Sequence, residues 1–163
     1  MALFSKLFNK KMYSDTDVVS PVKGRMIPCS EINDAVFSQE MMGQTIGIEP
    51  CDGVVCSPVN GVIEAMFPTH HAFGIKTANG TGYLVHIGID TVALNGEGFK
   101  AFAKQGDSVK AGQKIVVVDM DKVKKAGYPL TTMLIVTDKP SEDFKVNYID
   151  YKDVERAEII NLN

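Results

Sequence analysis

Closely spaced turn signals constrain the fold of this chain more than any other feature. From Val18 onward, Gly, Pro, Asn and Asp recur about every eight to twelve residues and separate short apolar segments. Only two short segments, Gly98–Ala103 and Asp121–Lys125, look helical. This spacing predicts an all-β protein, an antiparallel β-sandwich or barrel with very short helices. The predicted strands are Val18–Met26, Thr45–Ile48, Val54–Ser57, Gly61–Met66, Ala72–Thr77, Gly82–Ile89, Ile115–Asp119, Thr132–Val136, Val146–Tyr148 and Glu158–Asn161.

A short motif occurs twice and indicates a duplicated β unit. Ser20-Pro21-Val22-Lys23-Gly24 recurs as Ser57-Pro58-Val59-Asn60-Gly61, and an apolar segment follows each copy. Proline suits the edge of a strand and glycine suits a tight bend, so both copies are typical of a sheet that turns sharply.

The composition is that of an ordinary globular protein. The 163 residues are 45% apolar and 23% charged, which suits one domain with a real core. The net charge of −3 comes without a long basic run, which argues against nucleic acid as a partner. Cys29, Cys51 and Cys56 form no regular disulfide framework, and no apolar stretch approaches the roughly 20 residues that span a bilayer. We therefore expect a cytoplasmic protein.

The first residues differ from the rest of the chain. We expect residues 1–17 to form a flexible amphipathic tail, with Tyr13–Asp17 as a polar linker, before a single domain at 18–163. The segment Ala2–Lys11 could make weak contact with a membrane surface, or it could fray or rest on the domain as a flap. Its pattern consists of Leu3, Phe4, Leu7 and Phe8 on an apolar side and Lys6, Lys10 and Lys11 on the other.

The segment 67–92 holds the residues that could carry chemistry. Two apolar strands flank Asn79-Gly80, the strongest short hairpin signal. If these two residues form the turn, Phe73 lies opposite His86 and His71 lies opposite Gly88. Alternation then places both histidines on one face as diagonal neighbours, with backbones about 7–8 Å apart. A register shift of one residue would separate them onto opposite faces.

Two polar residues are expected on the face of the two histidines. Thr69 can hydrogen-bond an imidazole, and Asp90 lies opposite Thr69 at the end of the face. The remaining histidine, His70, is expected at the surface on the opposite face.

Paired imidazoles suit phosphoryl transfer. Neutral imidazole is a good nucleophile near pH 7, and its second ring nitrogen can donate a hydrogen bond that holds the ring. A neighbouring imidazole can donate to the phosphoryl oxygens and stabilise their charge. Two alternatives remain open: histidines without a chemical role, and a zinc site with His71, His86 and Asp90 as ligands. Because no H-E-x-x-H spacing is present, a two-histidine site would need a further ligand from a partner.

Apolar residues near the histidines are either core or a docking surface. Any single one is most simply interpreted as core, whereas a cluster around an exposed histidine would receive a protein partner. The residues predicted for this docking patch are Val36, Phe37, Phe67, Phe73, Gly88 and Val92.

The two histidine segments read P-T-H-H-A-F-G-I at 68–75 and V-H-I-G-I-D-T-V at 85–92, and L-N-G-E-G-F follows at 94–99. Together they resemble the glucose-type enzyme IIA (EIIA type 1) of the bacterial phosphoenolpyruvate:sugar phosphotransferase system. Asp34-Ala35-Val36-Phe37 and the repeated P-V-x-G motif resemble the same family. The resemblance runs from about Ser20 to the C-terminus.

The resemblance implies a phosphotransferase component with an exposed two-histidine site on a β-sandwich or barrel. His86 falls on the phosphorylated position, carried on Nε2, His71 on the partner histidine and Thr69 on its hydrogen-bonding residue. The family accepts the phosphoryl group from the phosphocarrier protein HPr and gives it to the IIB domain of a sugar permease. It requires no cofactor, although zinc can lie between the two histidines and a partner's carboxylate. Relatives also bind regulatory proteins, and free-standing members carry a short amphipathic tail.

The sequence departs from this family at two places. Thr45 stands where the family usually has glycine. The final turn, Lys152–Ala157, lacks the usual glycines, so its hairpin is expected to bend differently.

Two other classes of protein compete with this interpretation. Gly106–Ile115 followed by Lys122 superficially resembles a lipoyl or biotinyl carrier domain that is modified at Lys122, but such domains are much shorter. The other class is a zinc-binding, hydrolase-like domain.

Overall fold

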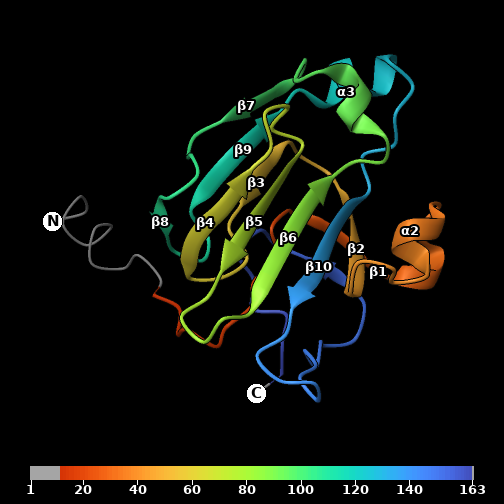
Figure 1. Ribbon diagram of the computed structural model, residues 1–163. Helices are drawn as coiled ribbons and strands as arrows, with labels where there is room; N and C mark the ends of the chain where they lie inside the picture. Colours follow the sequence, from red (N-terminus) through yellow and green to blue (C-terminus); the bar gives the residue numbers. More distant parts are fainter. Residues whose placement is uncertain (1–11, 163) are drawn as a thin grey trace, which may run out of the picture.

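The protein is an antiparallel β-sandwich, as its turn signals predict, and this computed structural model describes residues 12–162 (Figure 1). The strands are β1 (Gly24–Pro28), β2 (Gln44–Pro50), β3 (Val54–Cys56), β4 (Gly61–Met66), β5 (Ala72–Lys76), β6 (Gly82–Ile87), β7 (Phe99–Ala101), β8 (Ser108–Val109), β9 (Lys114–Val118), β10 (Thr132–Asp138) and β11 (Asp153–Val154). The short helices are η1 (Cys29–Glu31), α2 (Ala35–Ser38), η2 (Thr91–Leu94) and α3 (Met120–Lys125). The large sheet has the order β11-β1-β2-β10-β6-β5-β4-β8, and the small sheet has the order β3-β9-β7.

Apolar side chains cover both faces of the large sheet. The main core lies between the sheets, where Phe73 and Val85 of the large sheet and Ile115 of the small sheet are 0% exposed. Full burial of a side chain such as Phe73 stabilises the fold by about 1.5–3 kcal/mol. A second cluster lies on the outer face of the large sheet, where Leu84 and Met133 are covered by η1 and α2. The sheet therefore has a platform on its outer face as well as a core.

The repeated S-P-V-x-G motif forms the same local structure twice. The Ser20 hydroxyl donates to the Val22 carbonyl at 2.6 Å, and the Ser57 hydroxyl donates to the Val59 carbonyl at 2.6 Å. Both serines are 0% exposed, so each hydroxyl is a buried polar group that the turn itself satisfies. The duplicated β unit is confirmed at the level of its turns.

The strand order of the large sheet shows that the duplication extends through the fold. Read from either end, β11 matches β8, β1 matches β4, β2 matches β5 and β10 matches β6. The two copies also bond reciprocally, because the Val19 N–H donates to the Pro58 carbonyl and the Cys56 N–H donates to the Pro21 carbonyl, both at 2.8 Å. The molecule therefore consists of two similar strand units related by an approximate twofold axis.

The final turn, where the family's usual glycines are absent, bends like its counterpart in the other unit. The Gly112 N–H donates to the Ser57 carbonyl at 2.9 Å, and the Ala157 N–H donates to the Ser20 carbonyl at 2.9 Å. Gly112 has a φ of +87°, and Ala157 adopts a similar left-handed φ of +67° without being a glycine. The other departure, Thr45, is accommodated because its hydroxyl donates to the Gly43 carbonyl at 2.8 Å.

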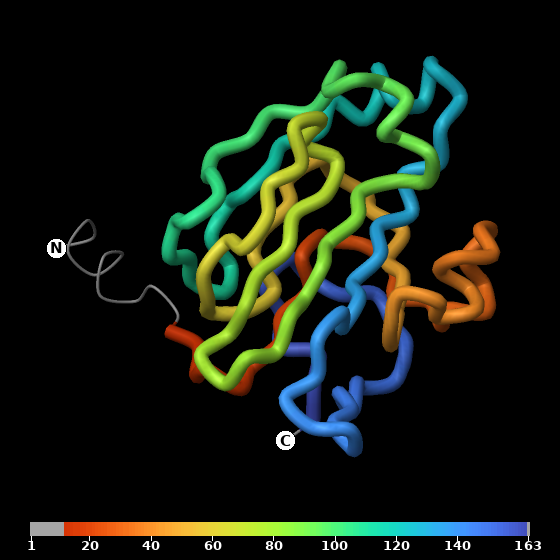
Figure 2. The backbone as a smooth tube through the Cα atoms, viewed as in Figure 1, coloured from red at the N-terminus to blue at the C-terminus, as the bar shows by residue number. Residues whose placement is uncertain are grey.

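The two ends of the described chain lie together at one edge of the molecule (Figure 2). Val19 forms a bridge with Ile159, and the Tyr13 hydroxyl donates to the Ala157 carbonyl at 2.6 Å. The Asn60 side chain donates to the Tyr13 carbonyl at 3.0 Å. Residues 13–17 are therefore part of the domain, and the predicted linker there is wrong. The predicted amphipathic segment at 2–11 lies outside the described residues.

The helix predictions are only partly right. The expected helix at Asp121–Lys125 is α3, whereas Gly98–Ala103 forms β7, because Phe99–Ala101 pairs with β9. Helix α2 was not predicted; it begins after Asp34, whose carboxylate accepts from the Val36 N–H at 2.9 Å. Between residues 12 and 162, no helix is long and apolar enough to cross a membrane.

The left-handed alanine gives a prediction for stability. A Cβ at this left-handed φ destabilises the folded state by about 1–2 kcal/mol. Glycine removes this strain, but it loses more backbone entropy on folding, by about 0.5–1 kcal/mol. Ala157→Gly should therefore raise the free energy of unfolding by about 0.5–1 kcal/mol. The matched control is Gly112→Ala, which should lower it, since the new Cβ would lie 3.3 Å from the Ala157 Cβ. Urea unfolding measures both. A lower stability for Ala157→Gly would contradict the assignment of strain.

Candidate functional site

The hairpin that carries the histidines differs from its predicted register by one residue. Ala72, not Phe73, lies opposite His86. The Thr77 N–H donates to the Thr81 carbonyl at 2.9 Å, so the loop holds three residues instead of two. The Asn79 carboxamide oxygen accepts from both threonine hydroxyls, at 2.5 and 2.8 Å, and these bonds stabilise the longer loop.

The two histidines still meet, because His71 lies before β5 and its side chain does not follow the alternation of side chains between the two faces of the strand. It precedes β5 and follows His70, whose left-handed φ of +59° closes a turn in which the His70 N–H donates to the Phe67 carbonyl. The pleat therefore does not set the direction of the His71 side chain. The centroids of the His71 and His86 rings lie 4.9 Å apart, with the rings nearly perpendicular at 84°. The prediction of neighbouring imidazoles is confirmed, although the register that led to it is wrong.

A backbone carbonyl fixes the His86 ring. Its Nδ1 lies 2.9 Å from the Gly88 carbonyl oxygen, and a carbonyl can only accept, so Nδ1 carries the proton. This tautomer leaves the lone pair on Nε2. The Phe37 ring, with its centroid 4.9 Å from that of His86, packs against the imidazole. His86 remains partly exposed at the outer face of β6.

Gly88 holds that carbonyl in place through a backbone conformation that suits glycine alone. Its φ is +82°, and a Cβ there would lie 2.4 Å from the Thr91 Cγ2 and 2.9 Å from the Pro129 carbonyl oxygen. Thr91 is itself fixed, because its hydroxyl donates to the Ile87 carbonyl at 2.5 Å. Gly88 is buried, so its predicted place in the docking patch is wrong, and it orients His86 instead.

His71 sits deeper than its neighbour. It is 3% exposed, its Nδ1 lies 2.5 Å from the Thr69 hydroxyl, and the Phe67 ring packs edge-on against it at 5.5 Å. Burial, followed by the proximity of His86, lowers the pKa of His71 to about 4. The expectation of two exposed rings therefore holds for His86 only.

Two carboxylates flank His86 and moderate the effect of its burial. Burial lowers the pKa of His86, while the Gly88 carbonyl and then the charges of Asp34 and Asp90 act in the opposite direction. Asp90 is the carboxylate that the sequence places on the face of the two histidines, and its charge acts on His86. Asp34 was missed, although an aspartate before a short helical segment is a recognisable N-cap signal.

The predicted docking patch divides into exposed and buried residues. Phe73 is 0% exposed in the main core, because the register shift places it opposite Val85, and its predicted partner contact is wrong. Phe37 is 7% exposed, so most of its ring supports His86. The residues that a partner can reach are Val36 at 40%, Phe67 at 38% and Val92 at 53% exposure.

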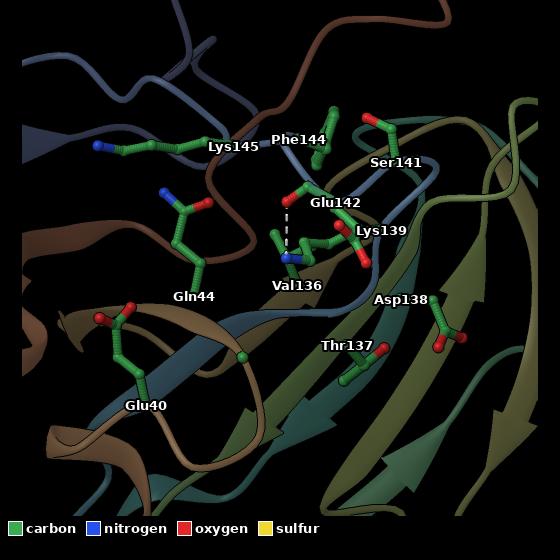
Figure 3. Close-up of a pocket in the computed structure, with 11 residues that line it drawn as sticks. Glu40, Gln44, Val136, Thr137, Asp138, Lys139, Ser141, Glu142, Phe144 and Lys145 are labelled. Atoms are coloured by element: carbon green, nitrogen blue, oxygen red, sulfur yellow. Dashed lines mark hydrogen bonds between the residues drawn. The ribbon is translucent and has the colours of Figure 1, made fainter.

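A groove of about 730 Å³ lies at the other end of β10 and is separate from the histidines (Figure 3). Its lining includes Val136 and Asp138, at the end of β10 where Asp138 pairs with Gly82, whereas His86 pairs with Met133. The Lys139 ammonium there donates to the Glu142 carbonyl at 3.0 Å. The groove contains no histidine and does not belong to the imidazole pair.

The competing classes find no support in the structure. Lys122 lies within α3 and not at the tip of a hairpin, where a lipoyl or biotinyl carrier presents its lysine. Across the described part of the chain, no group of three His, Cys, Asp or Glu side chains could hold a metal ion.

The low pKa of His71 links the stability of the fold to pH. Because the folded state favours neutral His71, the free energy of unfolding should be highest above about pH 6.5 and should fall as the pH drops toward about 4. His71→Gln should show a smaller fall over this window than the matched control His70→Asn, which suits the left-handed φ of position 70. Urea unfolding at a series of pH values measures this, and equal pH dependence in the two variants would contradict it.

Comparisons with known proteins show the family to which the chain belongs. The family model for the phosphoenolpyruvate-dependent sugar phosphotransferase system, EIIA 1, matches residues 16–141. A glucose-specific EIIA component of Bacillus cereus is 40% identical over 137 residues, which cover 83% of this chain and 82% of that protein. A glucose-specific EIIA component of Staphylococcus aureus is 36% identical over 158 residues, which cover 96% of this chain and 95% of that protein.

Longer proteins and a solved structure are also similar. A glucose-specific EIICBA component of Staphylococcus saprophyticus is 40% identical over 147 residues, which cover 90% of this chain but 21% of that protein. The chain thus spans about one fifth of such fused relatives. The structure of glucose permease IIA from Mycoplasma capricolum matches with a TM-score of 0.85 and 34% identity, covering 91% of this chain and 96% of that one. The chain therefore belongs to the EIIA 1 family of the phosphoenolpyruvate-dependent sugar phosphotransferase system.

Proposed function

We propose that this protein accepts a phosphoryl group on His86 from phosphorylated HPr and passes it to the IIB domain of a glucose-type sugar permease in the cytoplasm. The observation that carries this proposal is the bond between His86 Nδ1 and the Gly88 carbonyl, which leaves Nε2 as a nucleophile beside a second imidazole. Membership of the family makes the chain a phosphotransferase component. Relatives named EIICBA join such a chain to further components of the system, which supports transfer to IIB.

The transfer step needs no change in the protonation of His86. The Nε2 lone pair attacks the phosphorus of the donor's phosphohistidine, a new P–N bond forms, and the electron pair of the broken P–N bond returns to the donor's ring nitrogen. His86 must be neutral to attack, and burial favours that form by lowering its pKa. The Nδ1–H remains bonded to the Gly88 carbonyl throughout, so the ring keeps its orientation.

His71 stabilises the transferred group. With the Thr69 hydroxyl as donor to Nδ1, neutral His71 carries its proton on Nε2 and can donate it to a phosphoryl oxygen. A pKa of about 4 keeps His71 neutral at physiological pH, so its tautomer is stable during the transfer. Thr69 therefore acts as a positioning residue.

The surroundings of the site suit protein partners. Val36, Phe67 and Val92 offer exposed apolar contact near the imidazoles, and the carboxylates of Asp34 and Asp90 attract basic side chains of a donor or acceptor. Regulatory proteins would compete for the same surface.

Zinc is not required for this transfer, but the two imidazoles offer two nitrogen ligands of the kind that zinc prefers. Because the described residues supply no third ligand there, a bound zinc ion would need a carboxylate from a partner.

Substitution of the two histidines separates their roles. Incubation with enzyme I, HPr and phosphoenolpyruvate should label the protein on His86, and His86→Gln should abolish labelling because the nucleophile is gone. His71→Gln keeps the nucleophile and should still be labelled, but its transfer to IIB should be about 10²-fold slower, because the imidazole N–H is lost. Mass spectrometry maps the label and rapid quenching follows the transfer.

The matched control for both variants is His70→Asn, which suits the left-handed φ at this position and should be labelled and discharged like the parent protein. Normal labelling of His86→Gln would sink the assignment of the acceptor. Transfer by His71→Gln at the parent rate would remove the role of that residue and leave the acceptor intact.

A further inference from the structure

The outer face of the small sheet carries a concentration of positive charge that phosphoryl transfer does not explain. The segment Phe99–Val118 contains four lysines and one aspartate, in a chain whose net charge is −3. The Lys104 ammonium lies 4.0 Å from a carboxylate oxygen of Asp107, and no other ion pair involves these lysines within residues 12–162. We call the exposed set the lysine face; it consists of Lys100, Phe102, Lys104, Lys110 and Lys114.

An exposed aromatic ring belongs to this face and lies beside two of its lysines. Phe102 is 44% exposed, and the ammonium groups of Lys114 and Lys100 lie 4.0 and 5.3 Å from its ring centroid. Cation–π attraction holds the two charges beside the ring. The face therefore combines an apolar ring with positive charges placed around it.

The lysine face points away from the imidazole site. Phe99 and Ile115 enter the core between the sheets, so Lys100 and Lys114, their neighbours along β7 and β9, point outward. His86 lies on the outer face of the other sheet, on the side of α2 (Figure 1). A surface bound to the lysine face would therefore leave the histidines open.

The start of the described chain lies beside the same face. Tyr13 is bonded to Asn60, whose carboxamide oxygen in turn accepts from the Ala111 N–H at 2.8 Å. The preceding segment 1–11 thus joins the domain next to the turn between Lys110 and Lys114. Its sequence has three lysines and no acidic residue, so it has the same sign of charge as the face and would be repelled as an occupant.

We propose that the lysine face binds an anionic lipid surface. Lipid phosphates complement the lysines, and the apolar zone beneath them accommodates the Phe102 ring. Bound in this way, the molecule presents His86 away from the membrane surface.

Flotation of the full-length chain with vesicles of equal parts phosphatidylglycerol and phosphatidylcholine tests the proposal. The double variant Lys100→Gln/Lys114→Gln should bind about 25-fold more weakly, since each lysine near an anionic surface contributes about fivefold. Phe102→Ser should weaken binding without changing the charge. Vesicles of phosphatidylcholine alone should bind none of the proteins.

The matched control is Lys139→Gln/Lys145→Gln, which makes the same change in charge at the distant groove (Figure 3). Its binding should change about twofold or less, because charges beyond a Debye length are screened. Equal losses in the two double variants, or no loss in Lys100→Gln/Lys114→Gln, would overturn the proposal. In the second case the lysines only guard the edge strand β7 or bind an acidic protein. Unchanged unfolding temperatures exclude loss of the fold as the cause.

Discussion

The bond between the His86 Nδ1–H and the Gly88 carbonyl is the interaction on which the chemistry of this protein depends. It decides which ring nitrogen carries the proton and fixes the direction of the other nitrogen. The carbonyl points at the ring because Gly88 adopts a left-handed φ, and Thr91 and Pro129 fill the space that a side chain would need. Glycine is therefore needed at position 88 so that its carbonyl can hold the imidazole of His86, two residues earlier in the chain.

Burial and exposure are divided between the two imidazoles in a way that suits their roles. His71 is nearly enclosed, which keeps it neutral and holds it to Thr69, while His86 keeps contact with solvent on the side that a partner approaches. The apolar platform of η1 and α2 makes this division, because Phe37 supports the His86 ring without covering it. The outer face of the large sheet thus provides a dry environment without a deep pocket.

The sequence predicted β2 to β6, β9 and β10, most of which have glycine or proline near an end, where backbone preferences act locally. It missed β7, β8 and β11, which pair over only two or three residues, and the predicted strands Val146–Tyr148 and Glu158–Asn161 form only isolated bridges. It predicted the wrong hairpin register, because the side chains of Thr77, Asn79 and Thr81 together favour a three-residue loop. That single shift also explains why Phe73 was expected at the surface. The histidines meet as predicted only because the left-handed His70 redirects the chain before β5. Histidine tolerates this conformation more often than most residues do, but that preference is too weak to predict it at a given position. The docking residues were the hardest to predict, since exposure depends on the packing of α2 and of the loops around it.

The twofold arrangement of the strands has a consequence for how much the molecule can carry. The approximate twofold axis relates β6 to β10 and places Ile135 at the position equivalent to His86. Ile135 pairs with Leu84 in the same way as His86 pairs with Met133. Ile135 is 0% exposed beneath the platform, so the second unit offers an aliphatic side chain where the first offers a nucleophile. The strand unit therefore occurs twice, but the imidazole occurs at only one of the two equivalent positions. In the proposed transfer, each molecule would therefore carry one phosphoryl group, on the partly exposed imidazole of His86.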